Sequence, residues 1–291
     1  MKIKPIAFES LGVRSMATYV ETQDVKIFID PGASVSPDRY SLPPHKIELD
    51  RYYKIWESVK QWVLASDLVI ITHYHNDHHN SDTPEIYYRK DLMLKNPREF
   101  INETQKTRAA YFLSRIENVA KTITIADGAT FQIGKTRIAF SHPMTHGASD
   151  RLGFILQVLI EEDQRFIFTS DVQGPVTTEA ADFIVANQPH IMICDGPATY
   201  LLGTHCKKSE VDASVGNLKR IIDETPIRQL IIDHHLLRDI DWQNYIQELT
   251  KIKNGVTIQS AAAFSGEKED LLEAKRKDFY EGKLPNVDNY G

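Results

Sequence analysis

Short runs of β-branched and aliphatic residues recur along the chain, and turn residues separate several of them. We expect these runs to form strands: IKPIAF, ATYVET, VKIFID, LVIIT, TITI, TRIAF, LGFILQVLI, RFIFTS, IMIC and QLIID. Their lengths are typical of strands in globular proteins. Asp127-Gly128 and Gly134-Lys135 are turn dipeptides of the kind that join neighbouring strands.

Apolar residues at three- and four-residue spacing predict helices between these strands. The predicted helices cover residues 49–65, 211–223, a segment after Asp241, and the charged segment 267–282. Asn102 and Gln105 have the spacing of a capping box at the start of another helix. Because helices occur in both halves of a strand-rich chain, the pattern favours an α/β sandwich over an all-β barrel. We expect residues 1–291 to form one domain, with residues 80–120 as an insertion near the active site.

The composition is that of an ordinary globular protein, with 42% hydrophobic and 25% charged residues. The net charge of −6 argues against broad binding to nucleic acid or to an anionic membrane, both of which favour a basic face. The apolar runs are too short to span a bilayer, and the N-terminus lacks the pattern of a secretory signal. Two cysteines make no disulfide framework, so we expect a cytoplasmic protein.

Residues 70–80, IITHYHNDHHN, gather four histidines and an aspartate directly after an apolar strand. His73 and His75 are two residues apart, so on extended backbone both imidazoles point the same way and can bind one ion. Asp77 and His78 follow at a turn and suit a neighbouring ion. Solvated loop histidines are the alternative, but imidazole and carboxylate at this spacing favour a site for zinc, iron or manganese.

The motif His73-x-His75-x-Asp77-His78 resembles the signature of the metallo-β-lactamase fold superfamily. That resemblance implies a four-layer αβ/βα sandwich with mixed sheets and usually two metal ions. Further positions that it implies occur in order along the chain: Asp30, His146, Asp171 and His234. The segments GVRSMATYVET, IDPG, LPPH, THYHNDHH, RLGF and DHHLLRD also resemble an uncharacterised, largely archaeal family of predicted metal-dependent hydrolases within the superfamily.

Carried onto this sequence, the resemblance implies two divalent ions, with zinc favoured and manganese or iron as alternatives. The implied ligands of one ion are His73, His75 and His146. Those of the second ion are Asp77, His78 and His234, and Asp171 bridges both ions. Asp77 could also orient the nucleophile.

Several assignments stay open. His142 and His146 both lie in SHPMTHG; His146 is preferred as ligand, and His142 either supports a ligand, faces the substrate or packs beside Pro143. His234 and His235 are adjacent, and on extended backbone their side chains diverge. His234 is preferred as ligand, which leaves His235 as a candidate general acid or a structural histidine.

Other polar residues are candidates for supporting roles. Asp30 at a strand end is expected to hold the cluster loop through hydrogen bonds. His45, in SLPPH, is a candidate for the rim of the active site, and Arg108 for its wall. Asp195 ends the IMIC strand, where it could reach the metal edge or serve only a turn.

The resemblance implies a dinuclear hydrolase that uses a metal-bound hydroxide to cleave an ester-type bond. Phosphomonoesters and phosphodiesters are favoured, because paired metals suit in-line phosphoryl displacement. Carboxylic ester, thioester or lactone hydrolysis is the alternative, and a di-iron redox protein or a non-catalytic metal scaffold is less favoured. The expected substrate is a small or nucleotide-type molecule.

Overall fold

The computed structural model describes residues 1–252 and 255–284 and contains two large sheets. The first has the order β1-β2-β3-β4-β5-β6, and the second has the order β15-β14-β13-β12-β11-β8-β7. The strands of the first sheet are β1 (Lys2–Phe8), β2 (Met16–Glu21), β3 (Lys26–Ile29), β4 (Leu68–Ile71), β5 (Asp91–Leu94) and β6 (Thr122–Ile125). Those of the second are β7 (Thr130–Ile133), β8 (Thr136–Phe140), β11 (Val158–Glu161), β12 (Arg165–Phe168), β13 (Ile191–Asp195), β14 (Gln229–Asp233) and β15 (Thr257–Gln259).

Both sheets are mixed. Strands β3 to β6 pair in parallel, whereas β1, β2 and β3 pair antiparallel. Strands β12 to β15 are parallel, and β7, β8, β11 and β12 form an antiparallel half. The short strands β9 (Met144–Thr145) and β10 (Phe154–Ile155) make a separate hairpin.

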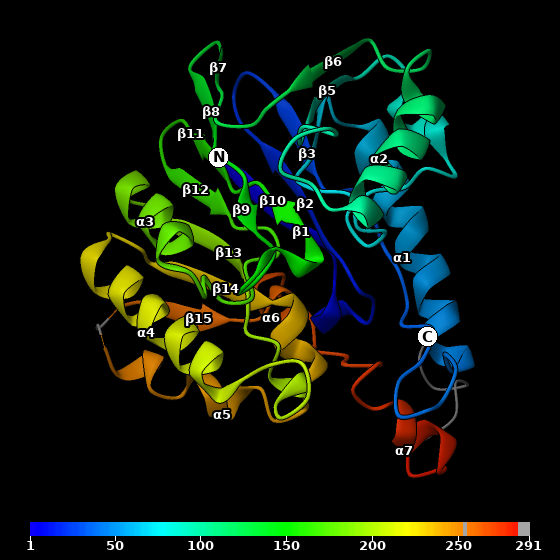
Figure 1. Ribbon diagram of the computed structural model, residues 1–291, viewed down its shortest axis with the longest axis vertical. Helices are drawn as coiled ribbons and strands as arrows, with labels where there is room; N and C mark the ends of the chain where they lie inside the picture. The colour runs from blue at the N-terminus through cyan, green and yellow to red at the C-terminus, as the bar shows by residue number, and fades with distance from the viewer. Residues whose placement is uncertain (253–254, 285–291) are drawn as a thin grey trace.

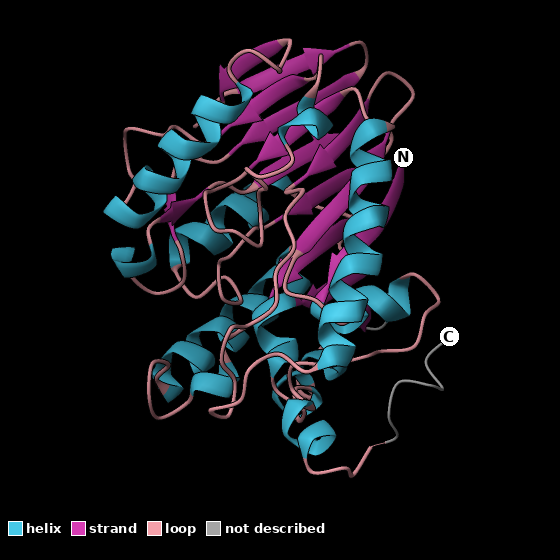
Figure 2. Cartoon of the chain, turned by 90° about the vertical axis from the view of Figure 1, so that its right-hand side faces the viewer, coloured by secondary structure: helices cyan, strands magenta, loops and turns pink. Residues whose placement is uncertain are grey.

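Helices cover the outer face of each sheet, which produces four layers (Figures 1 and 2). The helices are α1 (Lys46–Leu64), α2 (Glu103–Ile116), α3 (Thr178–Asn187), α4 (Lys208–Glu224), α5 (Gln243–Ile246), α6 (Ala261–Phe264) and α7 (Arg276–Tyr280). Helices α1 and α2 pack on the first sheet, and α3 and α4 pack on the second. The expected four-layer αβ/βα sandwich with mixed sheets is therefore confirmed.

Strand β4 is apolar at every position rather than at every second one, and its packing explains why. Leu68 and Ile70 lie in the core between the two sheets, whereas Val69 and Ile71 pack against the helices. A strand covered on both faces requires apolar residues throughout, and β4 reads LVII. This strand leads directly into His73.

Residues 80–120, expected as an insertion, contain β5 and α2. Strand β5 lies between β4 and β6, and α2 packs on the outer face of the same sheet. Asn102 caps α2, since its side chain accepts a hydrogen bond from the amide of Gln105 at 2.9 Å. The Gln105 side chain does not complete a capping box; its Oε1 accepts from the amide of Phe154 at 3.2 Å. Helix α2 is thus tied to the β9–β10 hairpin, whose connecting loop carries His146.

One expected helix is much shorter in the structure, and one strand was not predicted. The charged segment 267–282 is helical only in α7, because residues 267–275 follow an irregular path along which Asp270 and Glu273 pair with arginines of the N-terminal half. Strand β5 was not predicted, since DLML is short and lies within a polar segment. Among the described residues, no helix combines the length and the hydropathy needed to cross a membrane.

Candidate metal centre

The candidate site lies where strands of both sheets end. Asp30 follows β3, His73 follows β4, Asp171 follows β12 and His234 follows β14. Asp30, Ser170 and His234 adopt φ angles of 51°, 55° and 59°, which are uncommon for residues other than glycine. Backbone in this region is costly and concentrates at functional sites. Here it turns the chain sharply at the points where the polar side chains gather.

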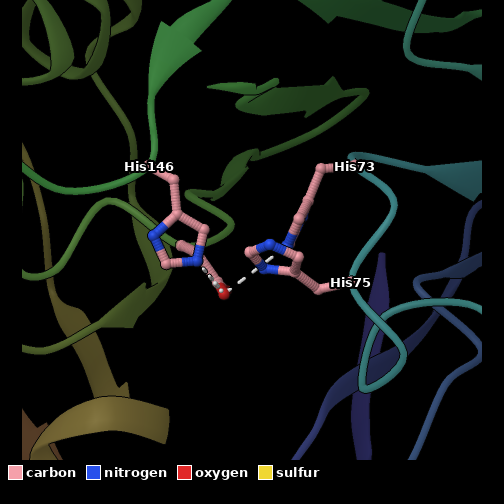
Figure 3. Close-up of side chains that lie close together, drawn as sticks. His73, His75 and His146 are labelled. Carbon is pink, nitrogen blue, oxygen red and sulfur yellow. Dashed lines mark ion pairs between the residues drawn. The ribbon is translucent and has the colours of Figure 1, made fainter. Parts of the chain in front are cut away.

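The first group of polar side chains contains His73, His75, His146 and Asp171, whose candidate ligand atoms all lie within 4.8 Å of one another. Oδ2 of Asp171 is 2.9 Å from Nε2 of His146 and 3.6 Å from Nε2 of His73. Figure 3 shows the ring of His146 facing those of His73 and His75 across a shared space. The structure thus brings together the residues expected around one ion.

The second group contains Asp77, His78 and His234, also within 4.8 Å. Oδ1 of Asp171 is 3.0 Å from Nε2 of His78 and 3.4 Å from Nε2 of His234. The two oxygens of Asp171 therefore face different groups. This is the arrangement that a carboxylate shared by two ions requires.

Several buried polar atoms of the two groups lack a hydrogen-bond partner among residues 1–252 and 255–284. Within the described residues, Nε2 of His73, Nε2 of His78 and Oδ1 of Asp171 are buried and make no hydrogen bond of acceptable geometry. Buried polar atoms normally have partners, because leaving one unpaired is costly. These atoms are of the types that bind zinc, iron and manganese. The residues present therefore fit divalent metal.

Buried carboxylates and hydroxyls orient the imidazoles of the first sheet. Oδ2 of Asp30 lies 2.8 Å from Nδ1 of His78 and accepts a hydrogen bond from Oγ1 of Thr72 at 2.6 Å. The hydroxyls of Thr72 and Ser170 lie 3.2 and 3.3 Å from Nδ1 of His73. Such partners fix which nitrogen of a histidine is free to bind metal. Asp30 therefore contacts both Thr72, which precedes the cluster, and His78 within it.

Glu9 is a functional candidate that the sequence did not reveal. It is buried in the short turn after β1, and its Oε2 lies 2.8 Å from Nδ1 of His234. Its Oε1 accepts a hydrogen bond from Nε of Arg238 at 2.8 Å. Nη2 of Arg238 is also 3.6 Å from Oδ2 of Asp77. A carboxylate within the apolar sequence IAFESLG is the only signal that could have pointed to Glu9.

His234 and His235 do not diverge as extended backbone would require. They begin a 3₁₀ turn, Asp233 having ended β14, and their ring centroids are 4.4 Å apart. Nδ1 of His235 lies 3.0 Å from both carboxylate oxygens of Asp195. Asp195 thus reaches the site through His235. The expectation of diverging side chains was wrong because it assumed a strand at this point.

A cavity of about 390 Å³ opens onto the cluster. Its wall includes His75, Asp77, His146, Asp171 and His235, together with three arginines, Arg14, Arg108 and Arg238. Arg108, expected at the wall, is contributed by α2.

Two candidates lie elsewhere. His45 caps α1, with Nδ1 accepting a hydrogen bond from the amide of Ile47, and its ring stacks on Phe279. It is therefore a helix cap rather than a residue of the rim. His142 is exposed and lies close to Gly128, outside the cluster and outside the residues that line the cavity.

The two groups differ in their protonation. Burial lowers the pKa of His73 well below its usual range and lowers that of His75 to about 3. Burial also opposes charge on His78, but Asp171 and Asp30 raise its pKa to about 10. The pKa of His234 is likewise raised, because Glu9 and Asp171 outweigh burial. The two imidazoles of the second group are therefore protonated and balance the charge of the buried carboxylates, whereas His73 and His75 of the first group are neutral.

Comparison with known proteins identifies the family. The chain is 42% identical over 287 residues to a UPF0282 protein of Korarchaeum cryptofilum, covering 97% of this chain and 95% of the relative. It is 41% identical to the UPF0282 protein MJ1629 of Methanocaldococcus jannaschii, covering 97% and 98% of the two chains. The chain belongs to the UPF0282 family. No protein-family model matches it.

Solved structures similar to this UPF0282 protein have the metallo-β-lactamase fold, as the sequence motif indicated. A possible metal-dependent hydrolase from Veillonella parvula has a TM-score of 0.53 at 13% identity, covering 85% of this chain and 94% of that one. An isothiocyanate hydrolase from Delia radicum gut bacteria has a TM-score of 0.53 at 15% identity, with the same coverage. The diiron β-hydroxylase CmlA from Streptomyces venezuelae has a TM-score of 0.52 at 11% identity, covering 89% and 52%. At such identities the similarity establishes only the fold of this UPF0282 chain and says nothing of its activity.

Proposed function

We propose that this protein is a metal-dependent hydrolase of phosphoesters, with phosphodiesters as the favoured substrates. One ion would be held by His73, His75 and His146, and the other by Asp77, His78 and His234. The observation that carries the proposal is the placement of Asp171, whose Oδ2 faces the first group and whose Oδ1 faces the second. When bound, two divalent ions supply hydroxide at neutral pH and stabilise charge on the phosphoryl oxygens.

The cationic wall of the cavity favours an anionic substrate over a neutral ester. Arg14, Arg108 and Arg238 line the cavity that contains the cluster. Arg14 and Arg238 are already paired with Glu273 and Glu9, so in the part of the chain that the structure describes Arg108 is the arginine of this wall that is free to meet a substrate anion. Guanidinium groups match the geometry of phosphate oxygens and stay charged at all relevant pH values. A neutral carboxylic ester or lactone would gain little from this wall.

His235 is the candidate for the general acid that protonates the leaving group. Its Nδ1 is engaged by the carboxylate of Asp195, so Nε2 is the nitrogen available to a molecule in the cavity. Burial and the nearby Arg238 lower the pKa of His235. The free imidazole is therefore neutral at pH 7, and His235 would take up its Nε2 proton only once an anionic substrate is bound, before passing it to the leaving group.

The experiment loads the purified protein separately with zinc, manganese and iron and determines the metal content by elemental analysis. Bis(p-nitrophenyl) phosphate, p-nitrophenyl phosphate, p-nitrophenyl acetate and a simple lactone are then assayed. We expect turnover of a phosphoester that His75→Ala reduces by about 10²-fold or more. Full occupancy of both sites without turnover of either phosphate substrate would overturn the proposal, and preference for acetate or lactone would favour the carboxylic ester alternative.

The role of His235 is tested by the dependence of the rate on the leaving group. His235→Asn should slow a phosphodiester with an alkoxide leaving group by about 10²-fold or more, since general acids contribute that much. The same variant should affect p-nitrophenolate esters much less, because that leaving group departs without a proton. Equal effects on both substrates would show that His235 is structural.

A further inference from the structure

Arg108 differs from the other two arginines of the cavity wall. Nε and Nη2 of Arg14 each lie 2.6 Å from a carboxylate oxygen of Glu273. Arg238 donates to Glu9 at 2.8 Å and to the hydroxyl of Tyr200 at 3.2 Å. Within residues 1–252 and 255–284, the guanidinium of Arg108 has neither a carboxylate within ion-pair distance nor a hydrogen-bond partner. Of the three arginines that line the cavity, Arg108 is therefore the one whose charge no carboxylate of the described residues balances.

The position of Arg108 also sets it apart. A second cavity of about 460 Å³ lies beside the first, and the two share Ser34, Val35, Asn76 and Arg108 in their walls. The second cavity is lined further by Tyr52, Tyr111, Asp82 and neighbouring polar residues. Arg108 thus stands at the junction between the metal cluster and a hollow with two aromatic side chains.

An unpaired arginine in a cavity wall is suited to a ligand anion. Guanidinium forms paired hydrogen bonds with carboxylate and phosphate oxygens, and such charge-assisted bonds are stronger than neutral ones. The carboxylates of the first cavity, Asp77 and Asp171, belong to the candidate ligand set and would be neutralised by metal. The remaining carboxylate near the junction, Asp82, is exposed and receives only a long contact from the Tyr111 hydroxyl at 3.5 Å. The negative charge of Asp82 repels an anion deep in the second cavity. A ligand anion is therefore expected at the junction between the two cavities, beside Arg108.

We propose that Arg108 binds a second anionic group of the substrate, separate from the group held at the metal cluster, so that the natural substrate is a phosphoester with a further carboxylate or phosphate on its leaving group. The inference rests on the proposed phosphoester hydrolysis and adds a specificity residue to it. The part of the substrate beyond the second anion lies in the hollow between Tyr52 and Tyr111.

The experiment measures binding of phosphonates that are not hydrolysed. Propylphosphonate carries one anionic group, whereas phosphonoacetate and 3-phosphonopropionate add a carboxylate at two distances. Affinities are measured calorimetrically on metal-loaded protein for the natural chain, Arg108→Ala, Arg108→Lys and Lys106→Ala. Lys106 is the matched control, because it removes one positive charge from the same helix but lines neither cavity.

We expect Arg108→Ala to weaken at least one phosphonocarboxylate by about ten-fold or more, which is the usual value of a charged hydrogen bond. Propylphosphonate should change by less than about two-fold, and Lys106→Ala should leave all affinities within that limit. Arg108→Lys should recover part of the loss. Equal effects of Arg108→Ala on the ligands with and without carboxylate would overturn the inference, as would a Lys106→Ala effect of the same size.

Failure of the Arg108 anion site and failure of the proposed phosphoester hydrolysis give different results in these experiments. Arg108-dependent affinity for the carboxylate, without turnover of any phosphoester, would retain the anion site and reject the reaction. Turnover of bis(p-nitrophenyl) phosphate together with an unchanged phosphonocarboxylate affinity in Arg108→Ala would retain the reaction and reject the site.

Discussion

Glu9 and His234 lie 225 residues apart in the chain, and Oε2 of Glu9 is 2.8 Å from Nδ1 of His234. The same carboxylate pairs with Arg238, whose Nη2 lies 3.6 Å from Oδ2 of Asp77. One buried residue of the N-terminal turn therefore orients two members of the second ligand group, one directly and one through an arginine.

Glu9→Gln should weaken the second metal site while retaining the shape of the side chain. Partners that orient metal-binding histidines typically contribute about 10- to 100-fold in metal affinity, and we expect a loss in that range. Competition titration with a chromogenic chelator measures the affinities. Glu57→Gln, which changes an exposed carboxylate on α1, is the control. Unchanged affinity for the second ion in Glu9→Gln would show that His234 needs no such orientation.

Gly32→Ala should disrupt the loop that carries the ligands. A Cβ atom at Gly32 would lie 2.4 Å from the amide nitrogen of His79 and 2.5 Å from that of His78. Because these are backbone atoms, the loop must shift, and we expect a loss of about 1–3 kcal/mol in unfolding free energy together with reduced metal content. Gly216→Ala in α4 meets no atom within 4 Å and should leave stability unchanged or raise it by about 0.5–1 kcal/mol. Chemical denaturation and elemental analysis of both variants check this, and full metal content in Gly32→Ala would contradict it.

The local part of the site could be predicted from the sequence. His73, His75, Asp77 and His78 are neighbours after an apolar strand, so their proximity needs only strand geometry and a turn. Placing Asp171 and His234 required the resemblance to a known fold, because nothing local links them to the cluster. The cap formed by Asn102 was also confirmed. Like the histidine motif, it depends only on residues that are close in sequence, because its partner Gln105 is three residues away.

The residues that support the ligands could not be predicted in this way. Glu9 acts through a contact across 225 residues, and Asp195 reaches His235 only because β13 and β14 are parallel neighbours. His45 was misplaced because proline-flanked histidines occur in loops as well as at helix starts. Its ring instead packs on α7, which the sequence pattern did not place beside α1.

Loading of the second site should release protons. The pKa of His78 is raised to about 10 by Asp171 and Asp30, and that of His234 is raised by Glu9 and Asp171, although burial opposes both shifts. Both imidazoles therefore hold protons at neutral pH when metal is removed, and metal binds only the deprotonated ring. Raising the pH removes the competing protons, so affinity should rise with pH, by up to about a hundred-fold per pH unit if two protons leave.

Calorimetric titration in buffers of different ionisation enthalpy measures the number of protons released. The first group supplies an internal comparison, because burial lowers the pKa values of His73 and His75 and leaves them neutral. We expect the ion bound there to release fewer protons than the ion bound by His78 and His234. Equal release at both sites, or none at the second, would contradict the assignment of charge.

The buried ion pair between Arg276 and Glu48 fastens α7 beside the first turn of α1 (Figure 1). Nε and Nη2 of Arg276 each donate to Glu48 at 2.8 Å, and the two residues are 0% and 2% exposed. Arg276→Met leaves the carboxylate buried without its partner, which should cost about 3–5 kcal/mol in unfolding free energy.

Urea denaturation of three variants tests this pair. Adding Glu48→Gln to Arg276→Met should recover part of the loss, because no buried charge then remains unpaired. Asp50→Asn, which breaks the exposed pair with Lys46 on the same helix, should cost less than about 0.5 kcal/mol. A cost of Arg276→Met as small as that of Asp50→Asn would mean that water reaches Glu48 once the arginine is gone, and that α7 is held by the packing of Leu272 and Phe279 against Ile47 instead.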